Sequence, residues 1–554
     1  MPSALSPLAP ARRVTWLDLL AVAVVTIAVF TPVFRTGFAP LDDVIMIVEN
    51  TKVTEPSWKH FKSFWVEPAF RIYMPLALST WQCVAWLTHS GTPGTPDYVL
   101  PVWGFKIVSV LTHAAAAAAA VWTLSVLTRT RWPAVVGGLI FALHPLQVES
   151  VAWTTGLKDQ YCGLFVILAV GWYARHAERD PPVPWTDAWW WAALAAAVLA
   201  TFSKPTAMVL PVLLLAVDWT VRRGDVAKRF VSLALFLLPA ISIAIVIFAV
   251  QGNTPVGRVA PALRPLVAAD SYAFYFGKLL WPTQLSIDYG RRPGTVLASG
   301  AIWWTWVFPV LALVAVLAMR SRRWVLAAVL FVVPIAPVSG ITVFDMQQFS
   351  TVTDHYVYQS LAGVGLAVAL LVWRWPRAGG TAAVAALCVL SVLTWRTATR
   401  WQSLEPLYAD MLEANPRSWL ARDLLSVFAL SRGDFATARR LLDASLRDNP
   451  ANGGAWDIQS SYFLQLCRYR ESADAGLKAT EKLNLQRLDV ARRLTLLGAR
   501  LKDIDLAEKG VRAWLKIEPD NRYVNEMLRS VRMARLQEKR AAATQPATQN
   551  GPPK

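Results

Sequence analysis

The chain is poor in the residues that build disulfide frameworks and zinc sites. Its 554 residues include four cysteines, Cys83, Cys162, Cys388 and Cys467, which lie far apart without a CxxC spacing. Charged residues are also scarce at 17%, and no nucleic-acid-binding motif accompanies the formal net charge of +18, so we expect no nucleic-acid partner. With 55% hydrophobic residues, this composition excludes disordered, collagen-like and disulfide-scaffold classes and indicates a membrane protein.

The charge that is present concentrates toward the C-terminal end. Residues 1–395 contain 28 Lys+Arg and 18 Asp+Glu, whereas the much shorter segment 396–554 contains 27 and 19. This change divides a long apolar part from a part with the composition of a soluble domain. We expect a membrane domain at 1–395, a soluble domain at 396–540, and a disordered Ala/Thr/Gln/Pro-rich tail at 541–554.

Apolar stretches long enough, or nearly long enough, to cross a bilayer recur through the first domain. They are 16–34, 102–127, 133–148, 160–175, 187–202, 205–221, 230–250, 301–319, 324–339, 357–373 and 379–395. The sequence therefore predicts an all-α, polytopic membrane helix bundle of about 11 spans. One merger of short stretches, or one extra span near Phe274 to Trp281, stays open.

Basic residues in short loops predict the orientation, because such loops face the cytoplasm. With the N-terminus cytoplasmic, the short basic turns share one side: Arg12, Arg13, Arg129, Arg131, Arg175, Arg179, Arg222, Arg223, Lys228, Arg229, Arg320, Arg322, Arg323, Arg374 and Arg377. An odd number of spans then makes the C-terminal domain extracytoplasmic. The polar outer segments become 35–100, 144–159, 251–300 and 340–356, where we expect the chemistry; ordinary loop solvation is the alternative.

A repeat runs through the C-terminal domain. Pro416, Pro450 and Pro519 are separated by 34 and 69 residues, and GDFATA (433–438) has the turn pattern of a tetratricopeptide repeat. Equivalent positions recur at Cys467, Tyr469 and Ser472, and again at Lys502, Ile504 and Ala507. This predicts an α-solenoid of about three repeats, the middle one degenerate, with a capping helix near 522–537. Such an array offers a groove for an extended peptide, and a structural cap on the membrane domain is the alternative.

The pair Asp42-Asp43 directly follows the first apolar stretch. Adjacent carboxylates near a membrane surface are costly unless they are solvated, bound to a metal or used as an acid or base. The interface and the neighbouring like charge both raise a carboxylate pKa toward that of a useful general base. As a bare dipeptide, however, the pair is also typical of a solvated turn.

Further polar residues stand where other spans begin or end. His144 and Glu149 are candidate metal ligands, with a polar helix cap as the alternative. Asp354, His355 and Tyr356 begin the tenth span and are expected to face the same chamber as His144 and Glu149. Cations placed for a lipid phosphate, or for simple extension to the membrane interface, are Lys158, Lys204, Arg291 and Arg292.

Taken together, these motifs resemble the C-type (GT-C) membrane glycosyltransferases. The closest subgroup is the transmembrane and tetratricopeptide-repeat O-mannosyltransferases and their bacterial relatives. The stretches that carry the resemblance are FAPLDDV (38–44), EN (49–50), YMPL (73–76), HPLQVESVAW (144–153), KD (158–159), SKP (203–205), LAVDW (215–219), LWP (280–282), LSIDY (285–289) and TDHYVY (353–358). The resemblance spans nearly the whole chain, including the order of the two domains.

The resemblance implies a lipid-linked sugar donor on polyprenyl phosphate and transfer to an acceptor hydroxyl with inversion, as in mannosyl-type protein O-glycosylation. In related mannosyltransferases the acidic pair reads Asp-Glu, which makes Asp42 the base and Asp43 its support through hydrogen bonding or metal coordination. His355 stands where many relatives have Arg, so phosphate binding there is in doubt. The resemblance also implies an acceptor protein as partner, membrane lipid around the bundle, and a place in the bacterial inner membrane. A requirement for a divalent metal stays open.

Two other classes of protein stay open on the sequence. A non-catalytic membrane scaffold would keep the fold while its repeats bind a partner, and His355 and the degenerate repeat leave room for it. A transporter is disfavoured, because the apolar stretches carry few internal charges and the polar residues gather on one face.

Overall fold

The computed structural model describes residues 14–93, 95, 97–180, 183–221, 226–251, 259–482, 488–519 and 521–544. Residues 545–554 of the predicted tail lie outside this range, as do Arg12, Arg13, Arg222 and Arg223 of the predicted basic turns. Within these ranges the chain is helical and has no strand beyond two isolated β-bridges, Ala69 with Ile72 and Ser90 with Val99. The predicted all-α fold is confirmed.

Two compact units make up the chain, Met1–Asp410 and Met411–Lys554. The predicted domain boundary near residue 395 falls inside a helix of the first unit and stays a prediction. Helices of the first unit are α1 (Trp16–Val29), α2 (Thr51–Thr54), α3 (Trp58–Val66), α4 (Pro75–Thr88), α5 (Trp103–Thr128), α6 (Trp132–Leu143), α7 (Val148–Ala152), α8 (Leu157–Arg179), α9 (Ala188–Ser203), α10 (Leu210–Val221), α11 (Val226–Leu233), α12 (Leu237–Gln251), α13 (Arg264–Leu280), α14 (Pro293–Ala298), α15 (Ile302–Thr305), α16 (Val307–Ala318), α17 (Arg322–Ile335), α18 (Leu361–Arg374) and α19 (Pro376–Arg400). Helix α20 (Leu404–Ala414) runs across the boundary between the units.

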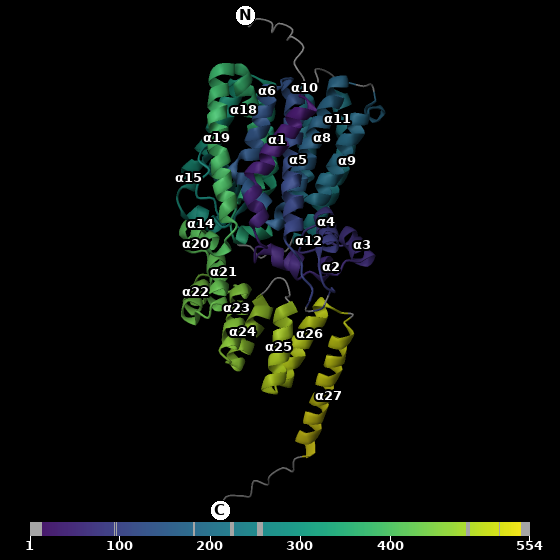
Figure 1. Ribbon diagram of the computed structural model, residues 1–554, viewed down its shortest axis with the longest axis vertical. Coiled ribbons are helices and arrows are strands. Elements are labelled where there is room, and N and C mark those ends of the chain that lie inside the picture. Colours follow the sequence, from purple (N-terminus) through teal and green to yellow (C-terminus); the bar gives the residue numbers. More distant parts are fainter. Residues whose placement is uncertain are drawn as a thin grey trace, which may run out of the picture. The chain divides into compact units, whose positions relative to one another are not determined.

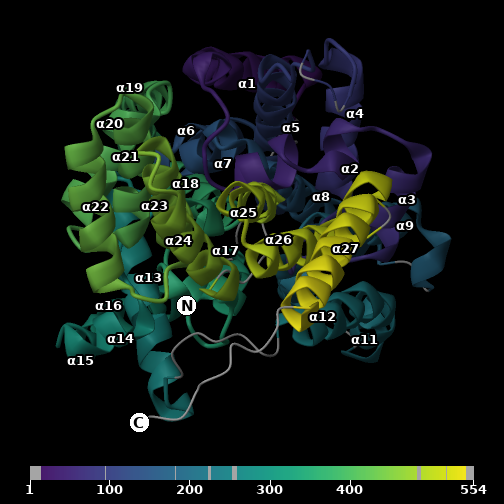
Figure 2. The ribbon, with the colours of Figure 1, turned by 90° about the horizontal axis from the view of Figure 1, so that it is seen from below.

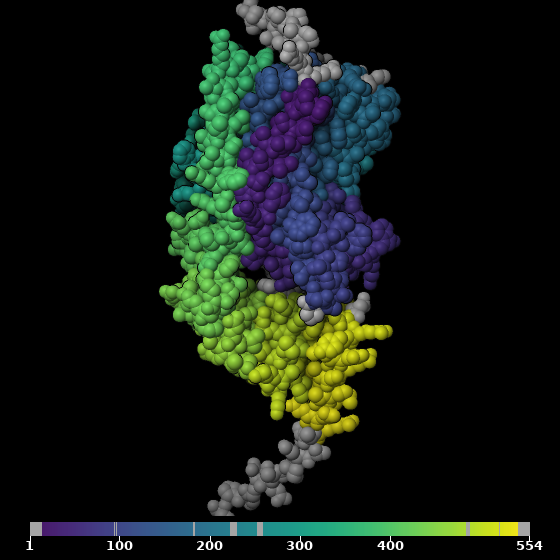
Figure 3. All heavy atoms as spheres, in the orientation of Figure 1, coloured from purple at the N-terminus to yellow at the C-terminus, as the bar shows by residue number. Residues whose placement is uncertain are grey.

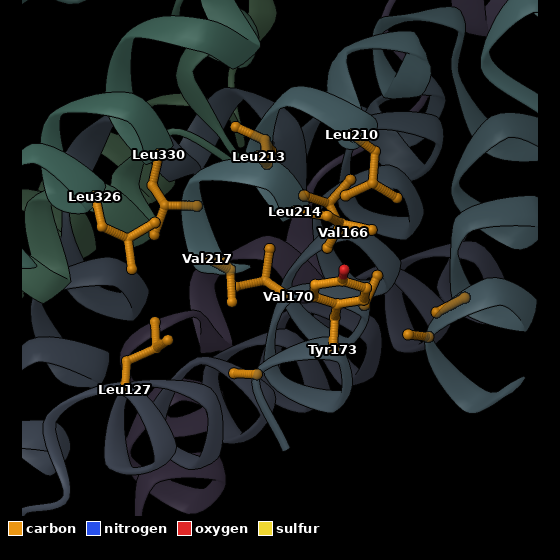
Figure 4. Close-up of a cluster of buried hydrophobic side chains, with 14 of the residues drawn as sticks. Leu127, Val166, Val170, Tyr173, Leu210, Leu213, Leu214, Val217, Leu326 and Leu330 are labelled. Atoms are coloured by element: carbon orange, nitrogen blue, oxygen red, sulfur yellow. The ribbon is translucent and has the colours of Figure 1, made fainter. Parts of the chain in front are cut away.

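The long helices of the first unit run side by side, with α5 and α8 in contact along much of their length (Figure 1). Leucines and valines from α5, α8, α10 and α17 gather in one buried cluster that also includes Tyr173 (Figure 4). Lipid tails are as apolar as leucine, so close packing rather than removal from water stabilises such contacts within a membrane.

The contact between α6 and α18 shows this close packing at two glycines. A Cβ on Gly137 would lie 2.3 Å from the carbonyl oxygen of Gly365, and one on Gly365 would lie 2.6 Å from that of Gly137. Small residues at such a crossing let the two backbones touch, as is common between membrane helices. Helix α6 thereby holds the 144–159 segment that follows it.

Three helices of the described ranges are long and apolar enough to cross a membrane: Trp103–Thr128, Phe230–Gln251 and Pro376–Arg400. A fourth is counted if Trp132–Leu143 and Pro145–Ala152, bent by 52° at His144, form one broken span. Shorter apolar helices are Trp16–Val29, Ala188–Ser203, Pro205–Val221, Ile302–Ala318 and Leu361–Arg374. These helices suit a membrane protein, and the count of about 11 spans stays a prediction.

The outer surfaces of α1 and α19 are apolar. These two helices pack against each other and lie together on the face shown in Figure 3. Leu20 and Val24 of α1 and Val384 and Val392 of α19 are more than half exposed. Large apolar side chains gathered on an exposed helical face suit contact with lipid.

The second unit is an array of packed helix pairs, which confirms the predicted tetratricopeptide-like solenoid. Its helices are α21 (Trp419–Ser431), α22 (Phe435–Asp448), α23 (Gly453–Gln465), α24 (Tyr469–Lys482), α25 (Leu488–Leu501), α26 (Ile504–Ile517) and α27 (Arg522–Thr544), and they follow one another in chain order (Figure 2). The turn inside each pair needs a left-handed residue, which is Gly433 in the first (φ 74°). Cys467 (φ 58°) and Lys502 (φ 55°) take its place in the other two, at the predicted 34- and 69-residue spacing.

Candidate active site

The two predicted catalytic carboxylates have different surroundings. Asp43 is fully buried, and its oxygens accept hydrogen bonds from the backbone N–H groups of Ala39 (3.0 Å), Thr154 (3.4 Å) and Thr155 (2.9 Å). Its carboxylate therefore ties the segment that follows α1 to the turn that precedes α8. A short π-helix, Val44–Val48, follows at once, and such helices are often found at functional sites.

Asp42, in contrast, is half-buried, and within the described ranges its carboxylate accepts no hydrogen bond. Its charge interacts with those of Lys158 and Asp43. Burial raises the pKa of Asp42 above its ordinary value, Lys158 opposes this shift, and Asp43 adds to it. A carboxylate that is free of hydrogen bonds and has a raised pKa can accept a proton from a hydroxyl group.

Glu149, on the short helix α7, reaches across to the start of the predicted tenth span. Its Oε1 lies 2.5 Å from Nδ1 of His355, and its Oε2 accepts a 3.2 Å hydrogen bond from the backbone N–H of Asp354. Burial lowers the pKa of His355, so the ring is neutral near pH 7. A neutral ring can contact phosphate only as a hydrogen-bond donor and brings no positive charge.

Two lysines come together near this turn. Nζ of Lys158 donates to the carbonyl oxygen of Thr155 (2.8 Å) and lies 5.9 Å from the ring centre of Trp153. Nζ of Lys204 pairs with Asp159, the neighbour of Lys158 on α8, and lies 5.2 Å from the ring centre of Tyr356. Both lysines are less than 10% exposed. Among the described residues, Lys158 donates only to an uncharged backbone group, so it keeps more of its charge for an anionic ligand than Lys204 does.

Asp354 is oriented by a tyrosine from the segment 285–289. The hydroxyl of Tyr289 donates to its Oδ1 at 2.7 Å. Burial raises the pKa of Asp354, although the Tyr289 hydrogen bond and the charge of Lys278 oppose the shift. The structure thus joins the segments 285–289 and 353–356, both of which carried the family resemblance.

The donor set does not fit a metal at His144. Its Nδ1 accepts from the backbone N–H of Leu146 (3.3 Å), and its Nε2 faces the carbonyl oxygen of Leu279 (3.3 Å), so backbone groups occupy both ring nitrogens. Glu149 is engaged with the 354–355 backbone and ring, as described above. No group of three or more His, Cys, Asp or Glu side chains is arranged to hold a metal ion in the part of the chain that the structure describes.

The two predicted phosphate-binding arginines lie in the segment after α13. Arg291 forms an ion pair with Asp270, which is almost completely buried, and its carbonyl oxygen accepts from Thr351 N (2.9 Å) and Oγ1 (2.8 Å). Arg292 occupies the N-cap position of α14, where its side chain makes no capping hydrogen bond. Because Asp270 already compensates its charge, Arg291 has less to offer a phosphate than Lys158 has.

Lys204 and several polar residues near it line a small pocket. Its lining is Asp159, Cys162, Lys204, Thr206, Val338, His355, Tyr356, Tyr358 and Gln359. The charge of Asp42 also interacts with the Tyr356 hydroxyl. This pocket therefore contains the Lys204 ammonium and several hydrogen-bonding side chains. Asp42 and Lys158 are not among its lining residues, but the charge of Lys158 interacts with that of His355, which lines it. Together these residues suit transfer from an anionic leaving group to a hydroxyl acceptor.

The sequence did not predict three side chains that bind the predicted site residues. Asp159 pairs with Lys204, Tyr289 orients Asp354, and Asp270 pairs with Arg291. Asp159 and Tyr289 stand inside stretches that carried the resemblance, so the motif was a usable signal for them. Asp270 stands in an ordinary helical segment and gave none.

Comparisons with known proteins agree with the motifs over part of the chain. No family model matches. The chain is 31% identical over 206 residues to Protein O-mannosyl-transferase Tmtc2 of Drosophila melanogaster, a match that covers 34% of this chain and 21% of that protein. The resemblance to the transmembrane and tetratricopeptide-repeat O-mannosyltransferases is thus confirmed, although the match spans only about a fifth of the relative's length.

Two solved structures can be aligned with the chain at low similarity. One is ArnT from Cupriavidus metallidurans bound to undecaprenyl phosphate, with a TM-score of 0.37, 13% identity, and coverage of 85% of this chain and 81% of that one. The other is the APC/C hetero-tetramer Cut9-Hcn1, with a TM-score of 0.22, 13% identity, and coverage of 76% and 89%.

Proposed function

We propose that this chain is a membrane glycosyltransferase of the protein O-mannosyltransferase type. It takes a sugar from a polyprenyl-phosphate donor and transfers it with inversion to an acceptor hydroxyl on the extracytoplasmic face. The observation that carries this proposal is the contrast between Asp42 and its surroundings. It is the one member of the acidic pair that accepts no hydrogen bond within the described ranges, and its charge interacts with that of the Lys158 ammonium.

In the proposed step, the acceptor oxygen attacks the anomeric carbon while the bond between that carbon and the donor phosphate oxygen breaks. The acceptor proton passes to Asp42, and the phosphate leaves with the bonding electron pair. Lys158 and Lys204 stabilise the negative charge that develops on the phosphate. No enzyme nucleophile is needed, because a single displacement inverts the anomeric centre.

Asp43 serves this step without touching the substrate. Its carboxylate already accepts three backbone hydrogen bonds, and these hold the loop next to Asp42 in place. Glu149 has a similar task, because it holds the 354–355 turn through two contacts. Both carboxylates support the chamber rather than coordinate a metal.

The side of the membrane and the acceptor follow from the predicted topology. The chamber residues come from the segments 35–100, 144–159, 285–289 and 353–356, which the basic-turn pattern assigns to the outer face. With about 11 spans the repeat array lies on that same side and can present an extended segment of an acceptor protein. A reporter enzyme fused after Asn415 tests this: an extracytoplasmic signal supports it, and a cytoplasmic signal contradicts it.

The catalytic proposal is tested with purified protein and a panel of polyprenyl-phosphate sugars, including the mannosyl form. We expect hydrolysis or transfer with at least one donor, and loss of both in Asp42→Asn. A well-folded protein that consumes no donor would favour the alternative function, a membrane scaffold whose repeats bind a partner.

A further inference from the structure

Helix α5 carries a lysine that is completely buried. Lys106 lies in its first turns, and none of the residue is exposed. Its Nζ donates to the carbonyl oxygen of Ala152 (2.6 Å) and to Oγ1 of Thr154 (2.9 Å). An ammonium group removed from water is expensive unless it is paired with an anion and hydrogen-bonded. Neither the proposed step nor the family motifs assign this residue a task.

The charge of Lys106 interacts with that of Asp43, and both residues are fully buried. Their geometric link is the turn at 152–155, to which both are hydrogen-bonded. They hold the same turn through opposite groups. Lys106 donates to the carbonyl oxygen of Ala152 and the hydroxyl of Thr154. Asp43 accepts from the backbone N–H groups of Thr154 and Thr155. The turn therefore lies between a buried cation and a buried anion.

Neighbouring contacts fix the same turn. Ser109, one turn further along α5, donates to the carbonyl oxygen of Val151 (2.7 Å), and Gln160 donates to that of Ser150 (2.7 Å). A Cβ on Gly156 would lie 2.3 Å from the Ser150 oxygen, so the turn cannot shift toward that side. Two uncharged contacts and a close backbone approach thus surround the charged pair.

This turn determines where Lys158 lies. The carbonyl of Thr155, whose N–H is held by Asp43, accepts the hydrogen bond from Lys158 Nζ (2.8 Å). Trp153 stands in sequence between Ala152 and Thr154, the two residues that Lys106 binds, and its ring centre lies 5.9 Å from the same Lys158 ammonium. The ammonium in turn is the cation that interacts with Asp42. A displacement of the turn would therefore be passed to the proposed base and the proposed phosphate ligand together.

We propose that Lys106 and Asp43 form a buried charge clamp that positions Lys158 against Asp42. Lys106 is a positioning residue, because it acts through Lys158 and does not touch the substrate. The inference rests on the proposed function for its catalytic consequence, whereas the clamp itself is a property of the fold.

A double-mutant cycle tests the clamp. Lys106→Gln keeps a hydrogen-bond donor but removes the charge, and we expect it to lower kcat/KM for the donor by roughly 10- to 100-fold, as misplacement of a reacting group does. In a Lys158→Met background the same change should cost less than about threefold, because its effect passes through Lys158. Equal costs in both backgrounds, or an effect of Lys106→Gln below about twofold, would overturn the inference.

Two further variants separate positioning from folding. Adding Asp43→Asn to Lys106→Gln removes the unpaired buried anion and should recover at least about threefold of the lost kcat/KM. Ser109→Ala is the matched control, since it removes an uncharged contact to the same turn and should cost much less than Lys106→Gln. If Lys106→Gln does not yield monodisperse protein, Thr154→Val removes one of the two Lys106 acceptors without changing a charge and replaces it in the cycle. Absence of recovery in the neutral pair contradicts the clamp.

Hydrogen exchange of the full chain in detergent gives a readout that does not depend on activity. The amides of Thr154 and Thr155 should exchange at least about tenfold faster in Lys106→Gln than in the wild type, whereas amides in the middle of α8 should not change. Unchanged exchange at the turn would refute the clamp. If the wild-type protein consumes no donor at all, the proposed function fails, and the exchange result alone decides about the clamp.

Discussion

The two ends of α8 carry polar clusters of different construction. At its C-terminal end, His176 pairs with Asp187 (3.1 Å) and Arg179 pairs with the same carboxylate (3.4 Å). Asp187 follows within one loop and also caps α9. At its N-terminal end, Asp159 pairs with Lys204, and the adjoining turn brings Glu149 to His355, more than 200 residues along the chain.

The difference separates a structural joint from a site. The C-terminal cluster joins neighbouring elements. Asp187 contacts the His176 ring and the Arg179 guanidinium and also caps a helix, so its carboxylate has little left for a ligand. The N-terminal cluster unites segments that fold together only in the complete bundle, and it leaves Asp42 without a hydrogen bond within the described ranges. The proposed catalytic end has a carboxylate, Asp42, without a hydrogen-bond partner in the described ranges, whereas the carboxylate at the other end, Asp187, is fully engaged. This difference separates a candidate site from a structural contact.

The largest expected difference between the ends comes from Asp42→Asn. This change keeps the size of the side chain but removes the proton acceptor, so kcat should fall by roughly two to four orders of magnitude while donor KM changes little. Asp43→Asn should lower kcat less. The measurement is steady-state transfer with the donor identified from the panel. Near-normal transfer by a folded Asp42→Asn protein, with Asp43→Asn inactive, would move the base to Asp43.

Lys158→Met should weaken donor binding at the same end. Loss of a charge-assisted hydrogen bond to phosphate is worth about 1.5–3 kcal/mol, or roughly 10- to 100-fold in donor KM. Arg175→Met on the same helix is the control and should leave donor KM within about twofold. If the two variants behave alike, Lys158 does not bind the donor.

Removal of residues 416–554 tests whether the repeats supply the acceptor. A groove that presents a protein segment raises its local concentration at the site, so protein modification should fall roughly tenfold or more, while donor hydrolysis stays within about twofold. Parallel assays of glycoprotein product and released sugar measure the two. Equal losses in both assays would make the array a structural cap.

The pH dependence of kcat/KM should report the surroundings of Asp42. The base works only when it is deprotonated, so activity is lost as the pH falls through the raised pKa of Asp42. Lys158 lowers that pKa, so Lys158→Met should move the acid limb of the profile to higher pH. The same profile of Arg175→Met should match the wild type. A shift to lower pH in Lys158→Met would exclude Asp42 as the titrating group.

The smallest effect on activity is expected at the opposite end. Asp187→Asn weakens contacts to His176 and Arg179 and should cost about 1–3 kcal/mol of stability, seen as a lower unfolding temperature in detergent. Its kcat and donor KM should stay within about twofold of the wild type. A large loss of kcat in folded Asp187→Asn would erase the distinction between the two ends.

Local patterns in the sequence predicted much of the fold. Period and turn chemistry are local, so the 34-residue spacing located all three helix pairs and the left-handed positions Gly433, Cys467 and Lys502. Helices also occupy each predicted apolar stretch, yet several are shorter than a bilayer is thick, so composition alone left the number of spans open.

The site was predictable as a set of segments but not as a set of contacts. Asp42, Lys158, Lys204 and His355 stand in stretches with recognisable motifs, whereas pairings such as Glu149 with His355 depend on how distant helices pack. His144 shows the same limit, because its motif suggested a metal ligand and only the fold reveals that Leu146 and Leu279 occupy its ring nitrogens. Lys106 drew no notice, since a lysine near a helix end most often extends to water.

Helix α8 also sets the distance between the two polar clusters at its ends. It is continuous from Leu157 to Arg179, and a rise of about 1.5 Å per residue separates Lys158 from His176 by about 27 Å along its axis. That length is close to the roughly 30 Å hydrocarbon thickness of a bilayer. A single residue inserted between them would turn one end by about 100° relative to the other and break either the joint or the chamber. The loop that follows α8 can therefore vary in length during evolution, whereas the number of residues in the helix between Lys158 and His176 is fixed.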